Sequence, residues 1–287
     1  MYLDSDDARS DFFLAAAVYV IGPTLIALLL DALPVGLAGG SLGTVILIAE
    51  PLITIAAMPL FLLRYRENSL AGLWGGGAGS LALGFGLASV FAVALGVGEV
   101  LAGGPVAQLP ELVPVAILIV VVVRWLSLSV LAIFLFRRAE YAFRPISESQ
   151  STLVRQAGLA CVGTALVATV LLLLADLPVW ALLPAAGLVG LFFLAERRLP
   201  QSGMGERWWV WAPVITLALG PLEIFSIFFD GSNFLVSAQQ AGGVALFGLV
   251  AVMALHNRRG GALVIGMSIG FMIANLLALA GGTRYFV

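Results

Sequence analysis

The sequence predicts an all-α fold: a polytopic bundle of eight or nine membrane-spanning helices that occupies residues 1–287 as a single domain. Composition gives the first indication, because 61% of the residues are hydrophobic and only 10% are charged, against about 25% charged residues in a soluble domain. The second indication is a series of apolar stretches of about 20 residues, the length that a helix needs to cross the hydrocarbon core. The third is the placement of arginine in the loops between them.

Nine apolar stretches are predicted as spans, and no polar segment between them is long enough to form a soluble domain. They cover residues 12–30, 42–63, 80–101, 112–136, 153–174, 178–195, 208–229, 234–255 and 262–280. Every second loop carries arginine, namely loops 64–79, 137–152, 196–207 and 256–261. With Arg9 and Arg155, this alternation places 12 of the 14 arginines on one side, which the positive-inside rule assigns to the cytoplasm. We therefore expect a multi-pass protein of the cell membrane with a cytoplasmic N-terminus.

The lipid bilayer is the first partner that this composition implies. The cytoplasmic arginines, Arg258 and Arg259 among them, are expected to meet anionic lipid headgroups. A net charge of −2 gives no indication of nucleic-acid binding. A homo-oligomer or a protein partner is compatible with a protein of this class.

Two stretches indicate an internal duplication of the chain. LLLDALPVG at residues 28–36 resembles LLLADLPVW at residues 172–180. Four spans per copy would keep the two halves, 9–144 and 155–287, in the same orientation, as in a parallel repeat. Leucine-rich helices that end in aspartate and proline also arise by chance, so both interpretations stay open.

Glycine occurs within two spans in patterns that suit close helix packing. Gly84 and Gly86 lie in the third span, and Gly266 and Gly270 form a GxxxG pair in the ninth. Small residues let neighbouring backbones approach in a membrane. We therefore interpret these glycines as packing positions.

Proline breaks accompany the acids of two other spans. The second span contains Glu50-Pro51 and then Pro59, and the seventh contains Gly220-Pro221-Leu222-Glu223. Proline removes a backbone donor and frees a carbonyl one turn earlier. A deep acid beside such a break is typical of transporter sites.

Three charged side chains lie deep in predicted spans: Glu50, Arg124 and Glu223. At ~1.5 Å per residue, Arg124 lies ~18 Å, Glu50 ~12 Å and Glu223 ~9 Å below the outer surface. An arginine in the bilayer costs at least ~2.5 kcal/mol on insertion scales, so it requires a partner, a cavity or a function. Three interpretations stay open: a buried ion pair that fixes helix packing, a substrate or proton site, and side chains that snorkel or line a water-filled cleft.

The residues of common catalytic sites are nearly absent. His256 is the only histidine and falls in a short loop, so a zinc site built on histidines is not expected. The sequence contains no HExxH or Walker A motif. We therefore predict no catalytic residues, no metal site and no cofactor, and the balance of the sequence is against an enzyme.

Two short segments carry a resemblance to a known family. Residues 61–73, FLLRYRENSLAGL, resemble the junction after the second helix in the CAAX-protease and bacteriocin-processing (CPBP) membrane proteins. Leu255 to Leu263, with Asn275-Leu276-Leu277, resembles that family's last helix. The family's activity needs a Glu-Glu-x-x-x-Arg helix and later histidines, and this chain has no adjacent glutamates and no histidine in its last helix. The resemblance implies a relative without the protease site, acting as a membrane scaffold or chaperone-like factor.

The sequence by itself favours a small-solute or ion transporter with its site at Glu50, Arg124 and Glu223. A lone arginine can hold a carboxylate or another anion. A glutamate can carry a coupling proton when burial favours its neutral form. The non-catalytic relative of the CPBP family remains the alternative.

Overall fold

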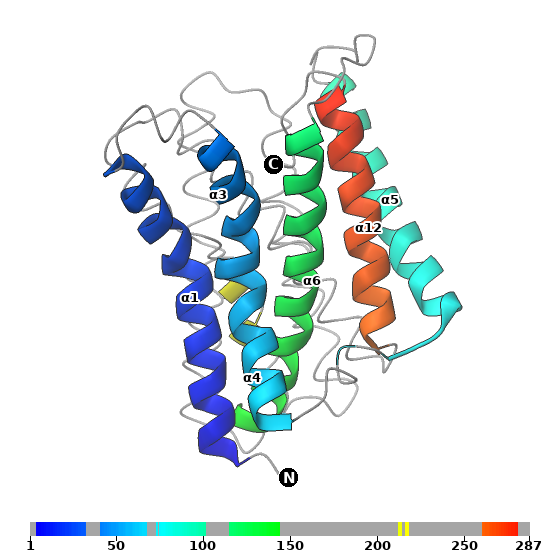
Figure 1. The fold of residues 1–287 in the computed structure, drawn as a ribbon. Coiled ribbons are helices and arrows are strands. Elements are labelled where there is room, and N and C mark those ends of the chain that lie inside the picture. Colours follow the sequence, from blue (N-terminus) through cyan, green and yellow to red (C-terminus); the bar gives the residue numbers. More distant parts are fainter. Residues whose placement is uncertain are drawn as a thin grey trace, which may run out of the picture.

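The computed structural model describes residues 4–32, 41–67, 73, 75–101, 115–143, 212–213, 216–217 and 260–280, and its elements within these ranges are helices. In chain order these are α1 (Ser5–Asp31), α3 (Ser41–Pro51), the π-helical segment η1 (Leu52–Ala57), α4 (Met58–Glu67), α5 (Ala78–Leu101), α6 (Val115–Phe143) and α12 (Gly260–Ala280) (Figure 1). Three stretches are long and apolar enough to cross a membrane: Ile48–Glu67, Leu118–Phe143 and Gly260–Leu277. The predicted all-helical fold with several apolar helices is confirmed for the described residues, and the count of nine spans stays a prediction.

The described helices run alternately up and down along one axis (Figure 1). α1 is antiparallel to α6, because Arg9 Nε donates a hydrogen bond of 3.0 Å to the carbonyl of Ala142 and Phe12 packs edge-on against Phe143. The N-terminus, the ends of α4 and α6 and the starts of α5 and α12 all lie at one end of the bundle. We call this the arginine end, because every described arginine except Arg124 is found near it.

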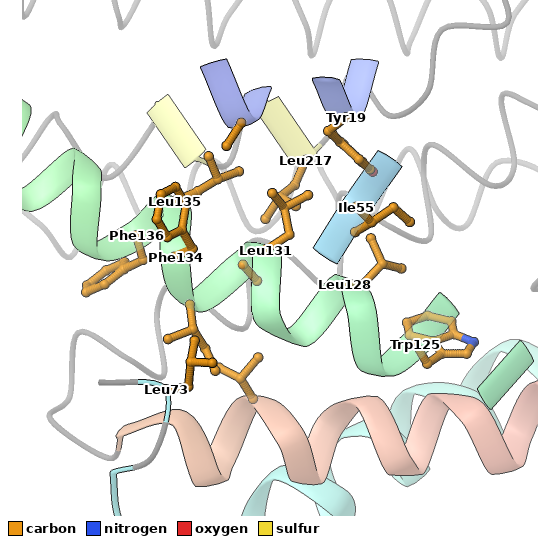
Figure 2. Packing of buried hydrophobic residues seen from close by; sticks show 14 of the residues in the cluster. Tyr19, Ile55, Leu73, Trp125, Leu128, Leu131, Phe134, Leu135, Phe136 and Leu217 are labelled. Carbon is orange, nitrogen blue, oxygen red and sulfur yellow. The ribbon is translucent and has the colours of Figure 1, made fainter. Parts of the chain in front are cut away.

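Helix α6 forms the centre of the described bundle. It packs against α1, α3, η1, α4 and α12. Five consecutive residues, Leu131 to Leu135, are at most 1% exposed, so all faces of the helix are covered there (Figure 2). A helix that is apolar on all sides is typical of a buried position. Lipid is as apolar as leucine, so van der Waals packing rather than the hydrophobic effect holds such a helix among its neighbours.

Helices α5 and α12 are parallel and pack at backbone distance. A Cβ added to Gly84 would lie 2.0 Å from the carbonyl oxygen of Leu263, and one added to Gly266 would lie 2.1 Å from that of Leu81. These contacts confirm the interpretation of Gly84 and Gly266 as packing positions. Gly270 also belongs to the interface, since a Cβ there would lie 2.6 Å from Cβ of Ala88. Gly86 contacts no neighbouring helix among the described residues, because none of them lies within 4 Å of its added Cβ, and for these residues that part of the interpretation was wrong.

The two helices begin from a shared backbone contact at the arginine end. Gly260 has φ = +71°, a region that glycine adopts without steric cost. Ala262 N–H donates a hydrogen bond of 2.8 Å to the carbonyl of Gly75. A Cβ on Gly260 would also lie 2.2 Å from the carbonyl carbon of Gly75. The glycines therefore set the register from which α5 and α12 run side by side.

Two helices extend past their predicted ends. The fourth span was predicted to end at residue 136, whereas α6 continues to Phe143, and α4 continues to Glu67 rather than ending at residue 63. The prediction ended each span at the first arginines, on the assumption that these were solvated loop residues. The structure instead buries Arg138 to 1% exposure, because acids on α1 and α4 pair with it.

The remaining predicted spans fall largely outside the described residues. Spans 153–174, 178–195 and 234–255 lie outside them, as does the comparison of the repeat halves 9–144 and 155–287. Of span 208–229, residues 212–213 and 216–217 are described and helical. Leu217 is fully buried in the same apolar cluster as Tyr19 and Leu131 (Figure 2). The seventh predicted span therefore contributes to the core around α6.

Candidate functional site

Glu50 and Arg124 come from helices that pack against each other. Glu50 lies on α3 and Arg124 on α6, and both side chains are half-buried. Each interacts electrostatically with the hydroxyl of Tyr19, which lies on α1. Two of the three predicted site residues thus lie on adjacent helices, within electrostatic range of the same hydroxyl. Glu223, the third, lies outside the described residues.

The depths of Glu50 and Arg124 follow from one contact at the arginine end. Arg138 of α6 bonds Glu67 of α4, with 2.6 Å between the guanidinium nitrogen and Oε1, and the two helices run in the same direction. Arg124 precedes Arg138 by 14 residues, and Glu50 precedes Glu67 by 17 residues. At ~1.5 Å per residue, Glu50 lies ~5 Å farther from the arginine end than Arg124. The sequence estimate of their separation in depth was ~6 Å, from the same rise per residue.

A change of helical register follows Glu50 directly. η1 is π-helical over residues 52–57, immediately after Glu50-Pro51 and before Pro59. Pro59 has no N–H to donate to the carbonyl of Ile55, so the regular α-helical pattern cannot continue through this turn. Short π-helical turns occur frequently at functional sites. The proline break that the sequence predicted beside Glu50 therefore takes the form of a π-helical turn.

Thr54 joins this turn to Glu50. Its Oγ1 lies 2.8 Å from the backbone oxygen of Glu50 and 3.1 Å from Oε1 of the same residue, so its single proton can be donated to either one. Gly22 of α1 lets η1 come close, because a Cβ there would lie 2.9 Å from Cγ2 of Thr54. The turn that holds Glu50 is thus packed tightly against α1.

Tyr19 carries a buried hydroxyl that has no hydrogen-bond partner among the described residues. Its side chain is 0% exposed and belongs to an apolar cluster with Ile55 and Leu128 (Figure 2). A buried polar group left unsatisfied costs about 1–3 kcal/mol. Sequence reasoning did not select Tyr19. The available signal was its position in the interior of a predicted span, since tyrosine is enriched at the headgroup level instead.

Trp125, the sequence neighbour of Arg124, points toward a different helix. Its indole stacks on Phe271 of α12, with ring centroids 5.4 Å apart and an interplanar angle of 13°. Arg124 interacts electrostatically with Tyr19 of α1. Adjacent residues on a helix diverge by about 100°. Two consecutive side chains of α6 can therefore interact with two different helices, α1 and α12. Ser129 and Ser268, one turn closer to the arginine end, continue the α6–α12 contact with a hydrogen bond between their hydroxyls.

A second charged cluster lies at the arginine end. Asp11 of α1 is 1% exposed, and its two carboxylate oxygens face Nε of Arg66 at 3.0 Å and Nε of Arg138 at 3.1 Å. Arg66 also pairs with Asp7 at 2.9 Å. Arg138 also pairs with Glu67, and its guanidinium lies 4.8 Å from the ring centroid of Phe134. The cluster therefore ties α1, α4 and α6 together.

Sequence reasoning missed this cluster as a structural unit. It assigned Arg66 and Arg138 to cytoplasmic loops and used them only to orient the chain. A signal was present, because Asp7 and Asp11 are spaced four apart and so share one face of α1. Asp11 pairs with arginines 55 and 127 residues further along the chain, which local patterns do not encode.

The comparisons with known proteins add no assignment. No family model, curated protein or solved structure matches the chain. The described helices, three of them long and apolar enough to cross a membrane, indicate a multi-pass helical membrane protein. Within the described ranges, no three histidine, cysteine, aspartate or glutamate side chains gather as metal ligands.

Proposed function

We propose that the protein is a small-solute or ion transporter whose site includes Glu50 and Arg124. The observation that carries the proposal is that these opposite charges lie on packed helices, α3 and α6, within electrostatic range of one buried tyrosine and beside a π-helical turn. Charged side chains within spans are costly and commonly mark substrate or ion pathways. A broken helix with an ionisable residue is also how many transporters build their sites.

Each charge has a role in this proposal. Arg124 holds an anionic group of the solute, because a guanidinium offers paired donors that match a carboxylate. Glu50 carries a coupling proton, which its carboxylate accepts and releases beside the Thr54 hydroxyl. Glu223, the third residue of the site predicted from the sequence, lies outside the described residues, so its part in the site stays a prediction.

Flux measurements with charge variants test the site. Proteoliposomes that contain the purified protein and an enclosed pH-sensitive dye are exposed to succinate, lactate, glycine, phosphate or chloride. We expect one of these solutes to drive a pH change with the wild-type protein. Arg124→Gln and Glu50→Gln should reduce that flux at least about tenfold, the effect of losing about 1.4 kcal/mol of interaction, while size-exclusion profiles stay normal.

Arg137→Gln is the matched control, because Arg137 lies on α6 at the arginine end. It should leave the flux unchanged. Full flux from both Arg124→Gln and Glu50→Gln would exclude the two charges from the mechanism. A Glu50→Gln protein with lower stability and no change specific to a solute would favour an ion pair that only holds helices together.

The orientation of the chain is a further part of the proposal. With Cys161 replaced by serine, a single cysteine at Gly77 should react with a membrane-impermeant thiol reagent only after cells are opened. A single cysteine at Ala32 should react in intact cells. Both positions are exposed and lie at opposite ends of the bundle. The positive-inside rule gives this expectation, and the reverse labelling pattern would place the N-terminus outside.

We propose one alternative, a non-catalytic scaffold related to the CPBP family. The observation that favours it is the use of Arg66 and Glu67, within the segment that resembles that family, to bind α1 and α6 rather than to line a site. A partner protein that copurifies with the chain, together with no flux and no stabilisation by any solute, would support this alternative over a transporter.

A further inference from the structure

We propose that Tyr19 is a substrate-binding residue, and that its hydroxyl and Arg124 together bind the carboxylate of a small organic anion. The inference rests on the proposed transport function and names the substrate class of the same site. One feature of Tyr19 carries it: its hydroxyl is buried without a hydrogen-bond partner among the described residues. Arg124 and Glu50 lie within electrostatic range of that hydroxyl and supply the charges of the site.

The first step concerns the free-energy cost of burying the Tyr19 hydroxyl without a hydrogen-bond partner. Phenylalanine would fill the same place among Ile55 and Leu128 with no polar atom to satisfy. Buried polar groups in folded proteins are nearly always hydrogen-bonded. A donor that the surrounding helices leave unsatisfied is therefore suited to a group that arrives from outside the chain.

The second step concerns the chemistry of that group. Tyr19 O–H and the Arg124 guanidinium are both donors, so together they favour a ligand with at least two acceptor oxygens. Arg124 supplies one positive charge, which a monoanionic carboxylate neutralises. Phosphate carries more negative charge at neutral pH and would be costlier to desolvate.

The third step concerns Glu50. Its carboxylate would repel an anion, so its place within electrostatic range of Tyr19 fits a carboxylate ligand only when Glu50 is protonated. The Thr54 hydroxyl, 3.1 Å from Oε1, can rotate to serve either protonation state of Glu50. Carboxylate binding and proton uptake would therefore occur together.

Thermal unfolding of the purified protein tests the assignment with Tyr19→Phe. Without solute, the variant should unfold at the same or a higher temperature than the wild type, because it removes an unsatisfied buried hydroxyl. With acetate, lactate or pyruvate, each a monoanion at neutral pH, the wild type should be stabilised. The half-saturating concentration for Tyr19→Phe should then be about ten to a hundred times higher, the usual effect of losing a hydrogen bond to a charged group.

Tyr141→Phe is the matched control, since Tyr141 is 55% exposed at the arginine end. It should change neither the unfolding temperature nor the half-saturating concentration. Equal half-saturating concentrations for the wild type and Tyr19→Phe would overturn the assignment, as would a lower unfolding temperature of solute-free Tyr19→Phe, which reveals a structural partner.

The outcomes also separate this inference from the proposed transport function. Carboxylate responses that are lost in Arg124→Gln but kept in Tyr19→Phe overturn the role of Tyr19 and leave the transporter proposal standing. A response to chloride, phosphate or methylammonium, with all carboxylates silent, overturns the substrate class alone. A wild-type protein that responds to no solute in either assay overturns both.

Discussion

Replacement of Gly84 by alanine should separate α5 from α12 and destabilise the protein by at least about 1–3 kcal/mol, the usual cost of overpacking. The added Cβ would lie 2.0 Å from the carbonyl oxygen of Leu263 and 2.9 Å from its carbonyl carbon. Backbone atoms cannot rotate aside as a side chain can, so the two helices must move apart along the whole contact. The measurement is the thermal unfolding midpoint in detergent, together with the yield of monodisperse protein.

Gly86→Ala provides the control for this substitution on the same helix. In the part of the chain that the structure describes, nothing lies within 4 Å of a Cβ at Gly86. Alanine is favoured over glycine in a helix interior by about 1 kcal/mol, so this variant should be neutral or more stable. Similar losses from Gly84→Ala and Gly86→Ala would mean that helix propensity, and not the close α5–α12 contact, determines the effect.

Asp11→Asn should destabilise the protein by about 3–5 kcal/mol, the usual cost of breaking a buried ion pair from one side. The substitution removes the carboxylate that faces both Arg66 and Arg138, and Arg138 is only 1% exposed. Arg138 would keep Glu67 as its remaining acid. Chemical denaturation or thermal unfolding of the purified variant measures the loss.

Asp6→Asn is the matched control, because Asp6 lies five residues away on the same helix. Its side chain is 82% exposed, and its distance to Arg9 is 3.6 Å, so the expected loss is at most about 1 kcal/mol. The double variant Asp11→Asn, Arg138→Met should recover part of the stability lost by Asp11→Asn alone, since it no longer buries a guanidinium that has lost one of its two acids, and Glu67, 31% exposed, stays hydrated. Equal losses from Asp11→Asn and Asp6→Asn would show that the cluster contributes no more than a surface pair.

The sequence predicted well those features that depend on local composition. The apolar stretch around Arg124 was expected to form a span, and α6 lies at the centre of the described bundle. The proline break after Glu50 was expected from Pro51 and Pro59, and η1 occupies that place. Membrane spans and proline breaks depend on residues within one or two helical turns of each other. They can therefore be predicted from a single sequence.

The features that the sequence did not predict depend on contacts between distant segments. Arg138 was taken for a loop residue because its pairing with Asp11 joins residues far apart in the chain. Tyr19 was not selected, because its significance depends on Arg124 and Glu50 from two other helices. Gly86 was grouped with Gly84 although the two glycines, two residues apart, point about 200° apart around α5. Only the neighbouring helix distinguishes them.

The contact between α5 and α12 has a consequence for the synthesis of the chain. α5 is complete at Leu101, whereas α12 begins at Gly260, roughly 160 residues later. At about 5–20 residues per second, the ribosome needs about 8–32 s to add that length. For this time the glycine face of α5 waits in the bilayer with lipid, or with an insertion factor, in place of its partner. The newly inserted chain can therefore complete this helix pair only after Gly260 has been added, and a chain that stops before Gly260 leaves the glycine face of α5 without α12.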